Sequence, residues 1–403
     1  MARLRTRFII PQFTVAHFSH HLSTGALVPL LPMIRDTFGI SYMQSGLLVS
    51  AFSISHGLGQ IPMALIADRT SRRRVILLGL IGTALCSIAI GATTSYWQMI
   101  PGFIAMGILG GTYHPPASSF LSQSVPRGQR GRSLGIHIIG GSLSFLLTPI
   151  LAVSIAQWSG NWRWSFIILA FPAILSSIMI WITTEDPQPE PVAAALPAQG
   201  SNATAGADTR AGETVSISFW EIFRAIGTLA SICLLIQLVS ASVNSYLPMY
   251  LVDRHGLPIG LAGIAVGLVY GAGIVGAPLG GSLSDRLGRK AVILLSVALS
   301  GPLLLAATLS PGVGLLLTFI TAYGVVISMR MPTMESLIAD VVPLNRRALA
   351  LGIYYLMSME TTGIITPLIG RLIDIQGLDP VFVGLALGLS IAGIIVLLLR
   401  KLI

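Results

Sequence analysis

The chain alternates long apolar segments with short polar connections. A helix needs about 20 mostly apolar residues to cross the hydrocarbon core of a bilayer, and twelve stretches satisfy this length. The pattern therefore predicts an all-α polytopic membrane protein with twelve transmembrane helices. We expect these helices over roughly 8–34, 44–67, 75–94, 96–122, 131–157, 163–183, 219–251, 259–284, 291–309, 312–339, 348–372 and 380–400.

Composition supports this class. The chain is 53% hydrophobic and 10% charged, whereas soluble domains carry about 25% charged residues. Cys86 and Cys233 both lie in apolar segments, so we expect neither a disulfide framework nor a cysteine metal site.

The net charge of +9 could suggest a nucleic-acid partner, but the distribution of the charges favours another explanation. With the N-terminus in the cytoplasm, most lysines and arginines fall in cytoplasmic loops, as the positive-inside rule requires. The basic residues therefore indicate orientation and not nucleic-acid binding. We expect a multi-pass protein of the plasma (inner) membrane with both termini in the cytoplasm.

An internal repeat organises the chain. Positions 217 residues apart match without a gap, among them Gly46 with Gly263, and Asp68 with Asp285; we call such residues repeat mates. Six spans per half make the repeats parallel, an arrangement in which transporters bind substrate between the halves. The expected units are a six-helix bundle over 1–183, a cytoplasmic flexible linker rich in Pro and Ala over 184–218, and a six-helix bundle over 219–403.

The repeat carries one polar loop twice. The copies are Ala64-Leu65-Ile66-Ala67-Asp68-Arg69-Thr70-Ser71-Arg72-Arg73-Arg74 and Gly281-Ser282-Leu283-Ser284-Asp285-Arg286-Leu287-Gly288-Arg289-Lys290. This pattern resembles the loops of the major facilitator superfamily of secondary transporters, although Ala64 and Ser71 replace its glycines. The resemblance covers nearly the whole chain outside the linker and implies two bundles that alternate access to a central cavity.

The resemblance also implies a role for the loops. Asp68 would meet the start of the eleventh helix and Asp285 the start of the fifth, where a carboxylate stabilises a helix N-terminus. Such contacts would hold the cytoplasmic side shut and then release it. The expected conformational latch comprises Asp68, Arg69, Arg72, Asp285, Arg286 and Arg289. The alternative is that these charges only set the topology.

Within the family, three stretches are similar to exporters of the fosmidomycin-resistance type. They are His17-Phe18-Ser19-His20 through Pro29-Leu30-Leu31-Pro32, Tyr113-His114-Pro115, and Gly140-Gly141 through Thr148-Pro149. The last resembles a helix-five motif of drug–proton antiporters, with Thr148 in place of its second glycine. His21 stands where many relatives have an acid, and the usual arginine early in the fourth helix is missing.

Polar side chains inside the spans mark an expected pathway. His17, His20, His21 and Thr24 share one helical face, which should turn towards a cavity or another helix because lipid disfavours polar groups. Other pathway candidates are His56, Gln60, Tyr113, His114, His137, Gln237 and Asn244. Each histidine could instead serve only as a neutral hydrogen-bond donor. We expect no cofactor and no metal, since no cysteine or carboxylate completes a usual zinc site.

Besides the histidines, the ionisable candidates for function within the predicted spans are Glu360, Arg330 and Glu335. Glu360 lies near the middle of the eleventh span, where burial favours a proton-carrying role. Arg330 is a candidate partner for a substrate or a carboxylate, with a structural ion pair as the alternative. Glu335 lies closer to the cytoplasmic end and is either a gate residue or a solvated helix end.

These observations predict a monomeric secondary transporter that exports a small organic compound, which could be an anion, in exchange for protons. The alternative is uptake or exchange of an organic anion bound by His20, His114 and Arg330. We expect no enzyme activity, since no nucleotide-binding loop and no Ser/His/Asp set was found in the sequence.

Overall fold

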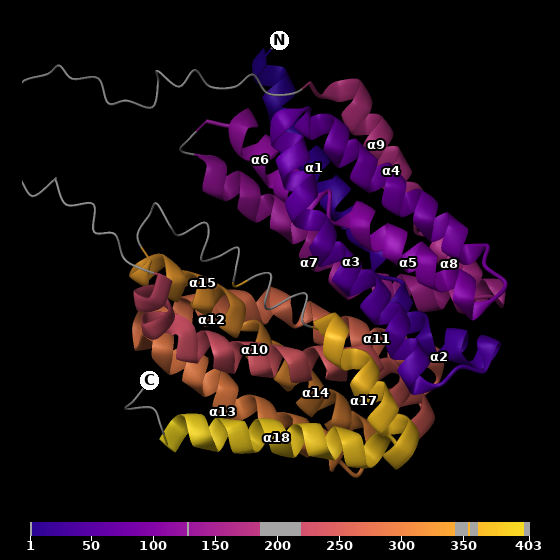
Figure 1. The fold of residues 1–403 in the computed structure, drawn as a ribbon, viewed down its shortest axis with the longest axis vertical. Helices are drawn as coiled ribbons and strands as arrows, with labels where there is room; N and C mark the ends of the chain where they lie inside the picture. The colour runs from indigo at the N-terminus through magenta and orange to yellow at the C-terminus, as the bar shows by residue number, and fades with distance from the viewer. Residues whose placement is uncertain (1, 127–128, 186–218, 343–353, 355–361, 399–403) are drawn as a thin grey trace, which may run out of the picture.

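A computed structural model describes residues 2–126, 129–185, 219–342, 354 and 362–398 (Figure 1). The described residues form helices and connecting turns. Within them, eight segments are individually long and apolar enough to cross a membrane. The predicted linker over 184–218 lies almost wholly outside the described residues, so the domain boundaries stay a prediction.

The first half consists of α1 (Ala2–Thr24), α2 (Leu27–Phe38), α3 (Tyr42–Arg69), α4 (Arg72–Gly91), α5 (Tyr96–Gly110), α6 (His114–Ser124), α7 (Arg130–Ser159), α8 (Arg163–Ile168) and α9 (Phe171–Thr183). The second half consists of α10 (Phe219–Met249), the π-helical turn η3 (Tyr250–Arg254), α11 (Ile259–Gly271), α12 (Gly273–Leu287), α13 (Arg289–Thr308), α14 (Val313–Ser328), α15 (Arg330–Val341), α17 (Thr362–Gln376) and α18 (Leu378–Leu398).

Several predicted spans are interrupted. The fourth breaks at residues 111–113, between α5 and α6, and the tenth breaks at Met329, between α14 and α15. The predicted spans 96–122 and 312–339 are therefore each formed by two helices, and Pro115 and Pro332 follow the two breaks. A proline cannot donate the helical hydrogen bond but is tolerated in the first turn, and each proline lies in the first turn of the new helix. The two breaks are repeat mates.

The first predicted span, 8–34, is interrupted as well. Helix α1 ends at Thr24 and α2 begins at Leu27. Between them, a Cβ on Gly25 would lie 2.8 Å from the carbonyl oxygen of His21 and 3.3 Å from the Thr148 side chain. Gly25 therefore permits a close approach of this break to α7.

The two halves meet through a symmetric pair of helix crossings. Helix α3 packs on α17, and their repeat mates α11 and α7 pack on each other. Glycine permits both contacts: a Cβ on Gly46 would lie 3.0 Å from the Cα of Pro367, and one on Gly267 would lie 2.6 Å from the carbonyl oxygen of Leu146. Helices can approach closely at such positions. Figure 1 shows α2, α11 and α17 at the end of the molecule away from both termini, which we call the closed end.

Polar contacts also join the halves at the closed end. Arg35 of α2 forms an ion pair with Asp253 of η3, and its Nη2 lies 2.9 Å from Oδ1. The Tyr42 hydroxyl donates to the same carboxylate at 2.8 Å. The Tyr246 hydroxyl, from the second half, donates to the Tyr42 carbonyl oxygen at 3.0 Å. This network was not expected from the sequence, because no motif links residues so far apart in the chain.

Candidate functional site

Six histidines gather midway along the first half. His17, His20 and His21 lie on α1, His56 on α3, His114 at the start of α6 and His137 on α7. We call these six residues the histidine cluster. The rings are in direct contact: His17 stacks on His137 with ring centroids 4.3 Å apart, and His114 lies 5.1 Å from both His20 and His21. The predicted stripe on α1 thus faces neighbouring helices.

Backbone carbonyls orient part of the histidine cluster. His17 Nδ1 lies 2.9 Å from the carbonyl oxygen of His137, and His137 Nδ1 lies 3.0 Å from that of Phe13. A carbonyl oxygen only accepts, so each Nδ1 carries the proton and, in the neutral ring, each Nε2 keeps a lone pair. The Nε2 atoms of His17 and His21 are 3.2 Å apart. In the neutral state His21 therefore donates to His17.

Exposure differs within the histidine cluster. His17, His20 and His137 are buried, whereas His21 and His114 are partly exposed. His20 Nδ1 is buried and has no hydrogen-bond partner among the described residues. His21 also contacts Phe145 of α7, and Phe145 contacts Tyr270 of the second half. The cluster thus lies near the surface that the first half presents to the second.

Two other predicted pathway residues bond locally. The Thr24 hydroxyl donates to the carbonyl oxygen of His20 at 3.0 Å, so its hydrogen is used within its own helix. Gln60 Nε2 lies 3.1 Å from His56 Nδ1, one turn away on α3. Gln60 therefore orients the imidazole of His56.

The second half holds a buried cation at its helix break. Arg330, the first residue of α15, is 5% exposed, and its Nη2 donates to Gln237 Oε1 of α10. Its Nε and Nη1, and Oδ1 of Asn244, have no hydrogen-bond partner among the described residues. Buried polar groups normally find partners. These atoms are therefore candidates for binding a polar ligand.

The two halves repeat one contact with different chemistry. His20 stacks on Tyr113 with centroids 4.8 Å apart in the first half. Their repeat mates, Gln237 and Arg330, are the pair that hydrogen-bonds in the second half. Both pairs join the first helix of a half to its interrupted fourth helix. Interrupted helices commonly form the substrate site of transporters.

The two predicted acids have different outcomes. Glu335 lies in α15 and is half-buried. Glu360 lies outside the described residues, so its role as the proton carrier stays a prediction.

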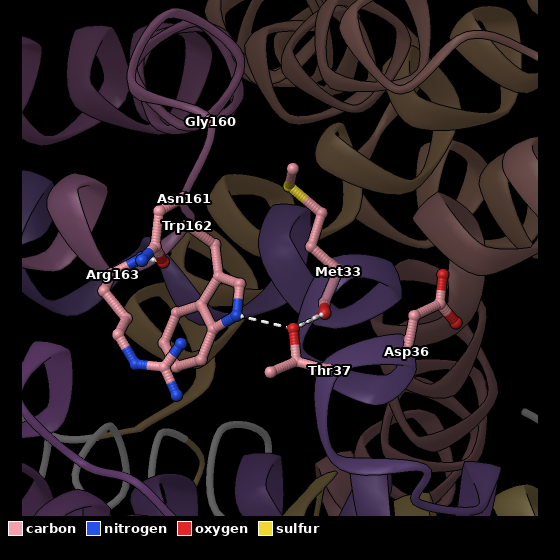
Figure 2. Close-up of a pocket in the computed structure, with 7 residues that line it drawn as sticks. All are labelled: Met33, Asp36, Thr37, Gly160, Asn161, Trp162 and Arg163. Carbon is pink, nitrogen blue, oxygen red and sulfur yellow. Dashed lines mark hydrogen bonds between the residues drawn. The ribbon is translucent and has the colours of Figure 1, made fainter.

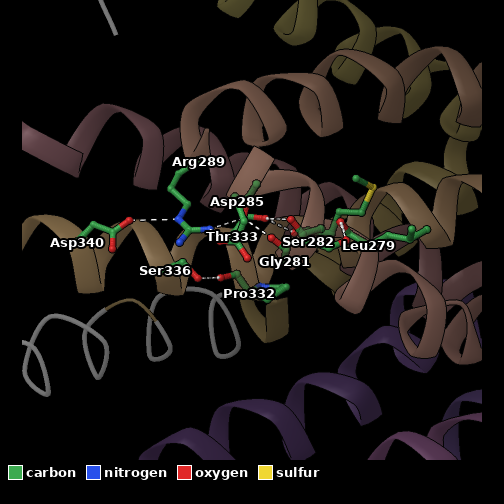
Figure 3. Close-up of polar contacts among 12 residues, drawn as sticks. Leu279, Gly281, Ser282, Asp285, Arg289, Pro332, Thr333, Ser336 and Asp340 are labelled. Atoms are coloured by element: carbon green, nitrogen blue, oxygen red, sulfur yellow. Dashed lines mark hydrogen bonds and ion pairs between the residues drawn. The ribbon is translucent and has the colours of Figure 1, made fainter. Parts of the chain in front are cut away.

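The loop arginines make matching contacts in both halves. Arg289 Nη1 pairs with Asp285 Oδ1 at 2.5 Å, and its Nε pairs with Asp340 Oδ2 at 3.1 Å (Figure 3). In the first half, Arg72 Nη1 donates to Gln123 Oε1 at 3.4 Å, and Gln123 is the repeat mate of Asp340. Each loop is thus tied to the fourth helix of its own half.

Among the described residues, the predicted latch residue Asp285 pairs with Arg289. Its carboxylate is exposed. Arg69 and Arg286 are exposed, and Asp68 lies in the last turn of α3. A latch at the end of the molecule that carries the termini would be released while the opposite end is closed, so the latch stays a prediction.

A pocket of about 450 Å³ lies elsewhere, against α2 and the turn between α7 and α8. Figure 2 shows Thr37 between Trp162 and the main chain of Met33; the Trp162 indole donates to the Thr37 hydroxyl at 2.9 Å. The lining residues belong to one half and include no member of the histidine cluster. We therefore do not assign this pocket to the pathway.

Comparison with known proteins identifies the family. The sequence profile of the Major Facilitator Superfamily matches residues 13–278 and 229–402. The chain belongs to this superfamily. It is thus a multi-pass membrane protein of a transporter family and not an enzyme, and the twelve-helix fold predicted from the sequence is confirmed.

Similar proteins include two with drug-resistance names. The multidrug resistance protein MdtG of Yersinia enterocolitica is 26% identical over 69% of this chain and 66% of its own length. The fosmidomycin resistance protein of Escherichia coli is 23% identical over 72% of this chain and 68% of its own length. The predicted resemblance to fosmidomycin-resistance exporters is confirmed.

Solved structures show the same fold. A bacterial homologue of the human lysosomal transporter Spinster, in an inward-facing and occupied conformation, superimposes with a TM-score of 0.81 at 17% identity, over 98% of this chain and 97% of that one. At this identity the likeness establishes the superfamily fold only.

Proposed function

We propose that this protein is a monomeric secondary transporter of the inner membrane that exports a small organic compound in exchange for protons. One observation carries the proposal: the repeat-mated pairs His20–Tyr113 and Gln237–Arg330 lie at the interrupted fourth helix of each half. Between two parallel repeats, this is where transporters bind substrate while the halves rock.

The arrangement of contacts supports an inward-open state. Cross-half contacts among the described residues include the α3–α17 and α7–α11 crossings at the closed end. The positive-inside rule assigns the opposite end, with its basic loops, to the cytoplasm. The likeness to an inward-facing structure agrees with this orientation. The substrate would then enter from the cytoplasm, as export requires.

The drug-resistance names of two similar proteins suggest which compounds to test first. Cells with and without the protein should be compared for susceptibility to a panel that includes fosmidomycin. Everted vesicles with an imposed pH gradient then test direction and coupling for each active compound. Accumulation of the compound that requires an acidic vesicle interior supports proton-coupled export. Accumulation that does not depend on the pH gradient contradicts proton coupling.

A second candidate function rests on Arg330. Two nitrogens of its buried guanidinium, Nε and Nη1, have no hydrogen-bond partner among the described residues. Such donors suit an anionic group. A transporter that binds an anion there can also move it inwards. Uptake or exchange of an organic anion is then the activity. Right-side-out vesicles that accumulate the anion would establish this alternative over export.

A further inference from the structure

Three imidazoles of the histidine cluster bring their ring nitrogens close together. His17, His21 and His114 each place one ring nitrogen within 4.8 Å of the others. We propose that these three imidazoles form a binding site for a divalent transition metal ion of the zinc class. The inference goes beyond the proposed transport function and does not depend on it.

The ring of His17 already has the orientation that a metal ligand requires. Its Nδ1 donates to the carbonyl oxygen of His137 at 2.9 Å, which leaves the Nε2 lone pair facing His21. Metal-binding histidines almost always donate their second nitrogen to such a carbonyl or carboxylate. The stacked ring of His137, 4.3 Å away, further restricts rotation of His17. The orienting contact of a metal ligand is therefore present.

The spacing of the donors also fits. Zinc–nitrogen bonds of 2.0–2.1 Å separate two tetrahedral ligands by about 3.3 Å. The Nε2 atoms of His17 and His21 are 3.2 Å apart, one turn apart on α1. An ion between them requires His21 to move its proton from Nε2 to Nδ1, a tautomer change without net loss of a proton. His114, at the start of α6, supplies the third donor.

No metal was expected from the sequence, because no cysteine or carboxylate completes a usual zinc site. Three neutral imidazoles suffice when the fourth position stays open, as in known three-histidine zinc sites, and imidazole suits zinc, copper and nickel. His21 and His114 are partly exposed, whereas His17 is buried. The open position therefore faces the exposed side, where water or an anionic oxygen can complete the coordination.

The internal repeat shows that packing alone does not require imidazoles here. The repeat mates of His17, His21 and His114 are Leu234, Leu238 and Met331. The same fold thus accommodates apolar side chains at all three positions. All three ligands belong to one half, so rocking of the halves would leave the site intact.

A second set of donors, His20, His56 and His114, also lies within 4.8 Å. His56 accepts at Nδ1 from the amide of Gln60 at 3.1 Å, so its Nε2 carries the proton in the neutral ring. Moving that proton to Nδ1 would set the N–H groups of His56 and Gln60 against each other, whereas the tautomer change at His21 breaks only the hydrogen bond to His17, which the metal ion replaces. We therefore assign the site to His17, His21 and His114.

The test measures metal binding by the purified full-length chain, with any polyhistidine tag removed. Zn²⁺ is titrated against a chromophoric chelator, and Cu²⁺ is used to detect nitrogen ligands by electron paramagnetic resonance. We expect one site per chain, weakened about tenfold or more in His17→Ala, His21→Ala and His114→Ala. Zn²⁺ should raise the Tm of the wild-type protein and not that of the variants.

His255→Ala is the matched control. His255 is the seventh histidine and lies outside the cluster, after η3 at the closed end, where burial and the neighbouring Arg254 lower the pKa of its imidazole. It is therefore another neutral imidazole, and its loss should leave Zn²⁺ affinity unchanged. If His17→Ala does not fold, His21→Gln and His114→Gln replace it, because their rings are partly exposed.

Three results would overturn the assignment. One is wild-type affinity in the folded His21 and His114 variants. Another is an equal loss of affinity in His255→Ala. The third is loss of binding in His20→Ala and His56→Ala while His17→Ala and His21→Ala bind normally. Because binding is read without transport, failure of the proposed function would not affect the outcome.

Discussion

The carboxylate of Asp374, on α17, accepts hydrogen bonds from the backbone N–H groups of Tyr42 at 2.9 Å and Met43 at 3.0 Å. These groups begin α3 in the other half. The first N–H groups of a helix have no partner within it. Ser41 and Gln44 satisfy the neighbouring N–H groups through a capping box. The first turn of α3 is therefore completed by a residue of the second half, and this contact must break when the closed end opens.

Asp374→Ala should favour the state in which the two halves separate at the closed end. The population of that state should rise about two- to fivefold, because the charge at a helix N-terminus is lost. Distances between spin labels at Thr94 and Gln376 would measure the shift. Its repeat mate Gln157 lies beside Gly260 at the start of α11. Gln157→Ala, which removes no charge, should change the distances less; an equal change would contradict the charge-based explanation.

Gly370→Ala should prevent full closure of the same end and reduce transport strongly. A Cβ at Gly370 would lie 2.5 Å from the carbonyl oxygen of Tyr42 and 2.7 Å from its carbonyl carbon, and backbone cannot give way as a flexible side chain can. Transport in proteoliposomes measures the effect. Gly384→Ala on α18, where a Cβ meets nothing within 4 Å, should transport normally. Normal transport by Gly370→Ala would show that α3 and α17 can separate enough to accommodate the added methyl group.

Arg330→Lys should weaken binding of an anionic substrate by about 10- to 100-fold, since a hydrogen bond to a charged group contributes about 1.5–3 kcal/mol and lysine cannot reproduce the planar guanidinium. Equilibrium binding in detergent checks the value. A neutral compound exported by the same protein serves as the reference. Equal losses for neutral and anionic compounds would show that Arg330 supports the structure and does not bind the anion.

Asp285→Asn should slow turnover and leave the Tm almost unchanged. Among the described residues, Asp285 forms an exposed ion pair with Arg289, and exposed pairs contribute little to stability. The latch hypothesis predicts that the Asp285 carboxylate contacts the start of α7 in the other conformation, in which the end of the molecule that carries the termini is closed. Asp340→Asn removes the other partner of Arg289 and is the control. A raised substrate Kd with unchanged turnover would argue against the latch.

Glu360→Gln should abolish uphill transport while substrate exchange survives, because glutamine keeps the shape of the side chain but cannot carry a proton. Both activities are measured in the same liposomes. Uphill transport at the wild-type rate would move the proton site to another residue, with His20, His21 and His137 as the next candidates. Loss of both activities in a folded protein would make Glu360 a substrate or structural residue.

Hydropathy and the repeat were sufficient to predict the fold, because lipid allows only segments that satisfy their own backbone hydrogen bonds. The same argument identified His17, His20 and His21 as inward-facing, since polar groups avoid lipid. The helix breaks at residues 111–113 and Met329 were not predicted. A proline shows that the helix is disturbed but does not show whether it kinks or restarts.

The sequence by itself determined the twelve-helix class, the parallel repeat and the concentration of histidines in the first half, because these follow from local composition and from a fixed spacing along the chain. Only the tertiary structure decided which ring nitrogens meet, that Arg330 contacts Gln237, and that Asp374 completes the first turn of α3. Those contacts join residues far apart in the chain. They depend on how helices cross and rotate against each other, which packing determines and periodicity alone does not.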